Sequence, residues 1–581
     1  MYPQCIHVPP RRVFPGADNR PQTRSPDRGR RSGTVKPDTC EHALLSQLAA
    51  TPFCDRLDLV ALSCWSQGAV YTATARLEEE GFAASLPHAT DLIPPTRRFH
   101  LTAAGVRRLA LELDLEVDEL LGARPISAHW RRLLLGRLDA LAVIYRLAAT
   151  VSSIAHPLRF RWYRAWPLDT ALLLPDGRSL GIIRQGLASD RTGFSKRLRR
   201  LYEGPLPGAI LMIVPDEVRL RHARRLLRGA PVPVFLSLER HVVASDADRP
   251  IWRLPSLAGV LGMRDALSVV SRQGVVPSEP RQGRALLPRG ATPEEQLLPS
   301  LLRPAEKRAL DLLFDWPWIT LGDLAGLLGV SPQRASQLLL SLEEFDVASR
   351  TVIAGRRRLA VTDRGLALIA RRDRASVGAV RKRWSAAPIE PRESLDWRGV
   401  SGSRSRQLLR NLEHTEAVHG FVAALARQAR ERGWEVVQLD PPQRASRYFR
   451  HGDTLHSVQP DAFGMLRRDE RTWPFFLEWE RRAVRPVTMA ARLAPYLRYY
   501  SSERPFEDHG AWPSVLVVFD DELAEVHFRR VARGEMERTG IDVPLWVSHR
   551  AELKESGPLE PKAWRRPGNP ATTDAPTGAS T

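Results

Sequence analysis

The 581-residue sequence is poor in cysteine and has no long apolar run. Its cysteines form no CxxC pair, and no histidine stands at zinc-finger spacing from them; they are Cys5, Cys40, Cys54 and Cys64. This pattern favours ordinary thiols in a reducing compartment over a zinc site. No apolar run approaches the roughly 18 residues of a membrane span. Residues 1–38 lack an apolar stretch of the signal-peptide type, so we expect a cytoplasmic protein without a membrane partner.

Lysine is also scarce, although the chain is strongly basic. Lys and Arg together number 86 against 66 Asp and Glu, which gives a formal net charge of +20, and only six of these cations are Lys. A surface this positive attracts polyanions, and nucleic acid is the first expectation. A basic protein at a membrane surface is the alternative class.

Composition divides the chain into several domains. Its length predicts about four domains at roughly 150 residues each. Residues 1–38 combine Pro, Gly and Arg with little apolar surface, so we predict a disordered basic arm. A linker is predicted at 261–303, and a disordered tail at 556–581.

The two halves on either side of this linker resemble each other. Residues 48–82 align with 313–347, and RFHLTAAG (98–105) aligns with RLAVTDRG (358–365). The spacing between the two aligned segments is five residues longer in the first half than in the second, a difference that a loop can absorb. We interpret this similarity as a tandem duplication of a two-domain unit.

The first part of the second unit has the pattern of a winged helix. Helices are predicted over 321–328 and 332–345, separated by Gly329 and followed by strands at 347–353 and 357–361. The side chains expected to bind DNA lie on the outer face of the last helix and at the strand turn; they are Gln333, Arg334, Gln337, Arg356, Arg357 and Arg358. A winged helix used for protein contacts is the alternative.

Three acidic residues form the sharpest chemical pattern. In a strand over 475–481, Glu478 and Glu480 share one face, and a hairpin with 461–466 would bring Asp461 beside them. Three carboxylates form a site suited to Mg²⁺, which could activate water for attack on a phosphodiester. Helix, strand, hairpin, helix and strand in this order are the layout of the PD-(D/E)xK nuclease fold.

The match to that nuclease pattern is incomplete. Glu480 stands where the pattern has Lys, so Arg481 is the candidate for the positive charge, with Arg482 as the other choice. Arginine cannot act as a base at neutral pH. Glu413 or Glu416 on the preceding helix could be a further metal ligand. In the alternative interpretation, the strand acids are solvated and paired to neighbouring arginines.

The first unit is a diverged copy. Its third helix, predicted over 67–80, offers Gln67, Tyr71, Thr74 and Arg76 but also carries the acidic run Glu78–Glu80. Asp169 stands two residues after Pro167, one residue later than Asp461 after Pro460, and the next strand, 180–185, has no acidic residue. This copy is expected to keep the fold without the site.

Five segments of the second unit resemble the bacterial replication-relaxation family, proteins of plasmids and integrative elements. They are VTDRGLALIA (361–370), LEHTEAVHGFVAALARQARERG (412–433), QPDAFGML (459–466), FFLEWERRA (475–483) and VLVVFDDELAEVHFRRV (515–531). The resemblance covers residues 305–565 and implies a role in plasmid replication or DNA relaxation.

Together these patterns predict an α+β and α/β multidomain protein of two tandem units. Each unit is a winged helix-turn-helix followed by a PD-(D/E)xK restriction-endonuclease-like domain. In the first unit these two domains are expected at 39–115 and 125–260, and in the second at 304–375 and 405–555. The expected function is that of a DNA-binding accessory protein of a mobile element. The alternatives are a Mg²⁺-dependent endonuclease or nickase and a winged-helix transcriptional regulator. The expected partners are double-stranded DNA, a second copy of the chain, and replication or mobilisation proteins.

Overall fold

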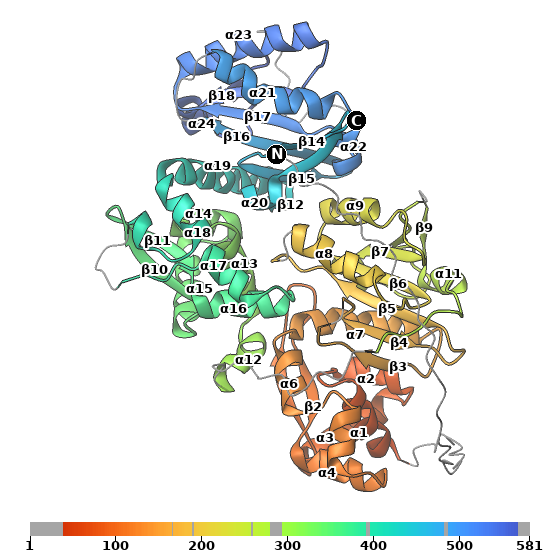
Figure 1. Cartoon of the computed structure of the whole chain (residues 1–581). Helices are drawn as coiled ribbons and strands as arrows, with labels where there is room; N and C mark the ends of the chain where they lie inside the picture. Colours follow the sequence, from red (N-terminus) through yellow and green to blue (C-terminus); the bar gives the residue numbers. More distant parts are fainter. Residues whose placement is uncertain are drawn as a thin grey trace, which may run out of the picture. The chain divides into compact units, whose positions relative to one another are not determined.

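The computed structural model describes residues 39–165, 167–188, 191–256, 259–278, 293–390, 396–480 and 486–567. Residues from Thr39 onward form one compact unit, and the predicted basic arm lies outside the described residues. The fold is mixed α/β, with two helical clusters and two larger sheets (Figure 1). None of the described helices is long and apolar enough to cross a membrane.

Three helices, a two-stranded antiparallel hairpin and a further helix occur twice along the chain. The first set is α1 (Cys40–Ala50), α2 (Arg56–Ser63), α3 (Gln67–Glu79), β1 (Ala83–His88), β2 (Thr96–Leu101) and α4 (Ala103–Glu112). The second set is α13 (Pro304–Asp315), α14 (Leu321–Leu328), α15 (Pro332–Glu344), β10 (Ala348–Ile353), β11 (Arg356–Val361) and α16 (Asp363–Arg372).

Local capping signals fix the helix boundaries of the second set. The Thr320 side chain accepts a hydrogen bond from the backbone of Asp323 at the start of α14, and Gly329 ends that helix with φ 71°. Ser331 caps α15, and Pro332 occupies its first turn. The helices and strands predicted between residues 321 and 361 agree with the observed ones within one residue at each end.

Unusual backbone positions coincide in the two sets. Phe53 and Trp318 both adopt φ 69°, immediately before the isolated bridge that each set makes to its hairpin. A Cβ added at Gly105 or Gly365 would lie 2.0 Å or 2.2 Å from a backbone carbonyl oxygen. The turn between β1 and β2 spans 89–95, and the turn between β10 and β11 spans 354–355, so the five-residue offset falls in the hairpin turn.

Each helical set is followed by a larger sheet. The first has the order β3 (Arg159–Trp162), β4 (Thr170–Leu173), β5 (Ser179–Arg184), β6 (Ala209–Val214), β7 (Val234–Leu238), β8 (Trp252–Arg253) and β9 (Val260–Leu261). The second has the order β12 (Glu435–Asp440), β15 (Ala462–Arg468), β16 (Arg471–Glu480), β17 (Ser514–Phe519) and β18 (Leu545–His549). In both, the first three strands pair antiparallel and the next two pairings are parallel.

Corresponding helices accompany the two sheets. In the first they are α7 (Leu138–Ser152), α8 (Arg191–Tyr202), α9 (Glu217–Leu226) and α10 (Glu239–Val243). In the second they are α19 (Leu412–Glu431), α21 (Pro486–Tyr500), α23 (Glu522–Thr539) and α24 (Arg550–Ser556). The second sheet has an added hairpin, β13 (Arg447–His451) and β14 (Thr454–Val458), and a short helix α20 (Pro442–Ala445).

One buried core joins the second helical set to its sheet. It runs from Leu310 and Leu338 through Val422 of α19 to Leu477 of β16. Gly326 of α14 lies against the α19 backbone, where an added Cβ would be 3.1 Å from a carbonyl oxygen. The helical set is therefore packed directly on the sheet domain, and it is not carried on a free linker.

Two segments predicted to be unstructured contain ordered parts. The predicted linker, 261–303, includes α11 (Met263–Ser268) and α12 (Pro293–Leu301), although 279–292 lie outside the described residues. The predicted tail includes a 3₁₀ turn, Pro561–Ala563, and its Trp564 is 3% exposed. A few apolar side chains anchor these stretches, and composition averaged over a window hides such anchors.

Candidate nucleic-acid interface and carboxylate site

Helix α15 presents a polar outer face. Its inner face buries the apolar side chains Ala335, Leu338, Leu339 and Leu342. Gln333, Arg334 and Gln337 are all exposed, as predicted from the 3.6-residue period. The Arg334 guanidinium donates to the Gln337 side-chain oxygen at 3.2 Å. These three side chains lie on the first two turns of the helix, where they are free of the protein core.

The arginines of the β10–β11 hairpin divide into two kinds. Arg356 and Arg357 are exposed at the turn. Arg358, which we expected to contact phosphate, is 2% exposed and forms an ion pair with Glu416 of α19. Arg356 also reaches Glu416, at 3.3 Å. Packing of the hairpin against α19 buries Arg358 and occupies Glu416, which had been a candidate metal ligand.

The equivalent surface of the first helical set is electrically neutralised. Arg76 of α3 pairs with Glu41 at 3.0 Å. Arg97 of β2 pairs with Glu78 at 3.2 Å. The exposed cations of α3 and β2 therefore have acidic neighbours, which weakens their attraction for phosphate.

Asp461 is fixed at the start of β15 by the neighbouring strand. Its backbone N–H donates to the Leu477 carbonyl at 2.8 Å, and its carboxylate accepts the Trp479 N–H at 2.8 Å. The other carboxylate oxygen lies 3.0 Å from Nε2 of His414, on α19. Both oxygens of Asp461 thus have a partner within the chain.

Glu478 and Glu480 share a face of β16, as the alternation predicted. Both line a cavity of about 380 Å³ between the sheet and α21. The Tyr496 hydroxyl donates to Glu478 at 2.5 Å. Glu480 forms an ion pair with Arg492, also on α21. His414, Tyr496 and Arg492 had no predicted role at the site, because these contacts join residues distant in the sequence.

Burial and neighbouring charge shift two pKa values here. Burial, followed by the charge of Asp461, raises the pKa of Glu478 to about 8. Burial alone would lower the pKa of His414, but its hydrogen bond to Asp461 and the charge of that carboxylate raise it. Glu478 is therefore largely protonated at neutral pH, and it can donate a hydrogen bond as well as accept one.

This arrangement does not fit the expected Mg²⁺ site. Among the described residues, no three His, Cys, Asp or Glu side chains are grouped to hold a metal ion. The predicted ligands Asp461 and Glu480 are engaged by His414 and Arg492. Arg481, the predicted catalytic cation, lies outside the described residues, as does Arg482. Mg²⁺ binding and catalysis at these positions stay predictions.

Asp169 of the first sheet has the same backbone contacts as Asp461. Its N–H donates to the Ile182 carbonyl at 2.8 Å, and its carboxylate accepts the Arg184 N–H at 2.7 Å. Its side-chain neighbours differ, because Arg197 and Arg374 each lie 2.9 Å away. Burial opposes ionisation of Asp169, but these two guanidinium groups outweigh it and hold its pKa well below the usual range. Asp169 is thus the centre of a buried ion-pair cluster.

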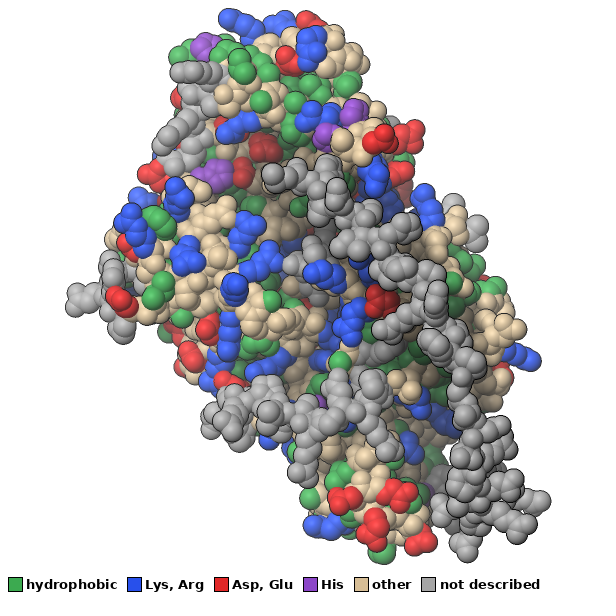
Figure 2. Space-filling view, in the orientation of Figure 1, with side chains coloured by type: hydrophobic (Ala, Val, Ile, Leu, Met, Phe, Trp, Pro, Cys, Tyr) green, Lys and Arg blue, Asp and Glu red, His purple; other side chains and the backbone are tan. Residues whose placement is uncertain are grey.

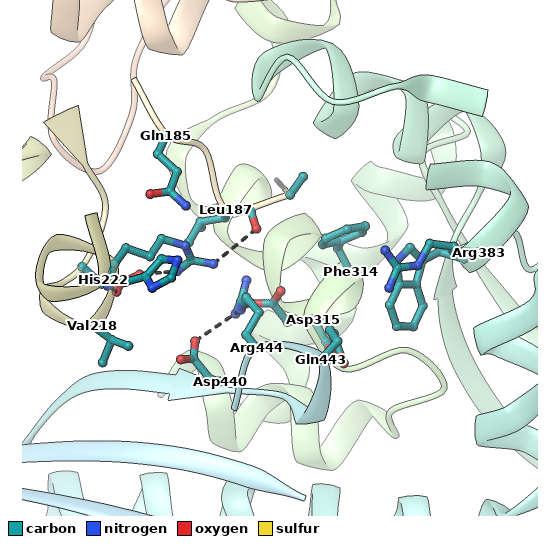
Figure 3. A pocket seen from close by; sticks show the side chains of 14 residues that line it. Gln185, Leu187, Val218, His222, Phe314, Asp315, Arg383, Asp440, Gln443 and Arg444 are labelled. Carbon is teal, nitrogen blue, oxygen red and sulfur yellow. Dashed lines mark hydrogen bonds and ion pairs between the residues drawn. The ribbon is translucent and has the colours of Figure 1, made fainter. Parts of the chain in front are cut away.

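A small cavity of about 70 Å³ lies beside α20 (Figure 3). Arg444 points between Asp440, at 3.2 Å, and Asp315, with which it also forms an ion pair. Burial raises the pKa of Asp315 to about 6, although Arg444 opposes this effect. The cavity is too small for a cofactor, and its ion pairs tie α20 to the end of α13.

Comparison with known proteins identifies one family. Residues 336–515 match the family described as replication-relaxation, which confirms the resemblance over a segment from α15 to the start of β17. The search of curated proteins found no match, and neither did the search of solved structures.

Proposed function

We propose that this protein is a DNA-binding accessory protein of a plasmid or other mobile element, acting in replication or DNA relaxation. The replication-relaxation match over 336–515 supports the process. The net charge of +20 supports a polyanionic partner. The partner proposed is duplex DNA, bound through helix α15.

In this proposal α13–α15 and the β10–β11 hairpin form a winged helix. The α19 helix and the second sheet form a PD-(D/E)xK-like domain, and the first half of the chain is a duplicated copy. The shared positive φ of Phe53 and Trp318 supports the duplication, as do the tight contacts of Gly105 and Gly365. The two larger sheets also support the duplication, because antiparallel and parallel strand pairings follow in the same order in both.

The observation that carries the proposal is the exposed face of α15. Gln333, Arg334 and Gln337 stand at the start of a helix whose opposite face is buried. Side chains of these types can hydrogen-bond base edges or phosphates when a helix lies in the major groove. Arg357 extends from the hairpin that follows, where a wing meets the phosphate backbone, and Arg356 stands beside it with Glu416 as a neighbour at 3.3 Å.

The test is duplex binding by the full chain, followed by fluorescence anisotropy. We expect affinity to fall by orders of magnitude between about 50 and 200 mM salt, because phosphate contacts release counterions. The triple variant Gln333→Ala, Arg334→Ala, Gln337→Ala should weaken binding about 10-fold or more. Arg538→Ala removes the same charge from an exposed position on α23 and serves as the control. Equal affinities of the triple variant and the wild type would refute the role of α15.

The same preparation separates the two alternatives. Nicking of supercoiled plasmid with Mg²⁺, lost in Glu478→Gln, would establish the nuclease in place of the accessory protein. Tight binding confined to one promoter sequence, with Glu478→Gln silent, would establish the transcriptional regulator. The accessory role predicts duplex binding without either result.

A further inference from the structure

A large basic cleft lies apart from α15. It has a volume of about 910 Å³ and is lined by α8 and α9 of the first sheet and by elements around Asp461 of the second. These elements include α17 (Val377–Trp384), α18 (Ser403–Arg410), α19, β13 and α22 (Arg504–His509). Its volume is at the upper end of the range for ligand sites, roughly 300–1,000 Å³.

Positive charge dominates the walls of this cleft. Its cationic side chains are Lys196, Arg199, Arg225, Arg383, Arg404 and Arg504. Against these six stand two carboxylates, Asp461 and Asp508. Asp508 is engaged by Arg225, and Asp461 is engaged by His414. Lys196, Arg199 and Arg404 are exposed, so the cleft retains a positive field. In Figure 2, Lys and Arg side chains gather across the middle of the face shown.

An aromatic side chain stands in the same cleft. Tyr448 of β13 is 50% exposed, although most of the described aromatic residues are buried or half-buried. Four amide side chains also line the walls; they are Gln407, Asn411, Gln443 and Gln459. Exposed aromatic rings in a basic groove provide stacking surfaces for bases, and amides can hydrogen-bond base edges.

The cations, the aromatic ring and the amides together favour one class of polyanion over the others. A duplex presents phosphates and base edges, and its stacked bases offer no open face to Tyr448. An acidic lipid surface or a polyphosphate would use the cations and the amide N–H groups, but it offers no flat base to the ring of Tyr448. Unpaired nucleotides use all three kinds of group, because each offers a phosphate, a flat base and hydrogen-bonding edges.

We propose that this cleft binds a single-stranded nucleic acid segment, with Tyr448 stacking on a base and Lys196, Arg199 and Arg404 contacting phosphates. The strand would pass the His414–Asp461 pair in the cleft wall. The inference deepens the proposed function, since replication and relaxation both expose single strands. Binding in the cleft requires no contact from α15, so an experiment can refute single-strand binding in the cleft without refuting duplex binding by α15, and the reverse.

The experiment measures binding of the full chain to oligo-dU, oligo-rU, a DNA duplex and inorganic polyphosphate. Tyr448→Ala should weaken oligonucleotide binding by about 5- to 100-fold, the range for loss of one base stack, and Tyr448→Phe should restore it. Duplex and polyphosphate binding should change less than 2-fold in Tyr448→Ala. The Arg404→Ala and Lys196→Ala variants should weaken oligonucleotide binding and reduce its salt dependence. Comparison of oligo-dU with oligo-rU, which differ only in the sugar, then shows which sugar is preferred.

The matched control is Tyr202→Ala, which removes a tyrosine that is 38% exposed and lies outside the cleft lining. It should leave all four affinities unchanged. Unaltered oligonucleotide binding in Tyr448→Ala would overturn the proposal, as would an equal loss of polyphosphate binding. Loss of oligonucleotide binding in the α15 triple variant would also overturn it, because a single site would then serve both ligands. Weaker duplex binding in that variant with unchanged oligonucleotide binding would support two separate sites.

Discussion

The Glu478 carboxyl gives a stability test with a definite sign. Burial and the charge of Asp461 raise its pKa from 4.5 to about 8 in the folded protein. Between these two values the folded state holds a proton that the unfolded chain releases. Stability therefore falls as pH rises from about 4.5 to about 8, and the contribution is fully lost above that range. The Glu478→Gln variant keeps a neutral side chain at every pH and removes this loss.

The size of the effect follows from the shift. A change of roughly 3.5 pKa units corresponds to about 5 kcal/mol at 1.36 kcal/mol per unit. Glu478 is half-buried and opens to the cavity beside α21. Water therefore screens part of the penalty, and about 1–3 kcal/mol is the expected difference. For a domain of about 150 residues this corresponds to a rise in Tm of roughly 2–10 °C for the variant at pH 9, with little difference at pH 5.

Thermal unfolding of the full chain at several pH values measures this difference. Glu470→Gln, in the exposed turn between β15 and β16, removes the same charge and should give a Tm difference near zero throughout. The difference in Tm between variant and wild type at each pH cancels the repulsion among positive charges that both proteins share. A difference between Glu478→Gln and wild type that stays constant from pH 5 to pH 9 would refute the electrostatic reasoning.

Two further predictions concern the packing of the helical set. Gly365→Ala should destabilise the protein by about 1–3 kcal/mol or more, because the new Cβ would lie 2.2 Å from the Val347 carbonyl oxygen. Gly378→Ala in α17 has open space around it and should be neutral or stabilising by up to about 1 kcal/mol. Arg358→Ala should cost roughly 1–3 kcal/mol, because the half-buried Glu416 loses its buried partner and keeps only the exposed Arg356, whereas Arg356→Ala should cost under about 1 kcal/mol. Chemical denaturation measures all four, and equal losses in either pair would contradict the packing described.

The local part of this fold could be predicted from sequence. The limits of α14 and α15 depend on Thr320, Gly329 and Ser331, whose capping roles act within a few residues. The alternation in β16 likewise placed Glu478 and Glu480 on one face. These signals are short in range, so no knowledge of the rest of the chain is needed to use them.

The partners of the site residues could not be predicted in the same way. Arg358 is exposed or buried according to how the hairpin packs on α19, about 60 residues away in the sequence. Glu480 and Arg492 meet because α21 returns across the sheet. The apolar anchors of the predicted linker and tail, such as Met263 and Trp564, were hidden by the Pro and Gly around them.

The likeness of Asp169 to Asp461 changes how chemistry at the site should be tested. Both carboxylates accept a strand N–H, at 2.7 and 2.8 Å, so the fold alone accounts for an aspartate at this position. An Asp461→Ala variant would lose a strand contact as well as any chemical role, and loss of activity in it would be ambiguous. Besides Glu478 and Glu480, the feature that distinguishes the second site is His414, since the side chains paired with Asp169 are Arg197 and Arg374. We therefore expect His414→Ala to leave Tm within about 2 °C of wild type while abolishing the Mg²⁺-dependent nicking that the nuclease alternative predicts. Nicking that persists in that variant would show that His414 takes no part in it and would refute this reasoning.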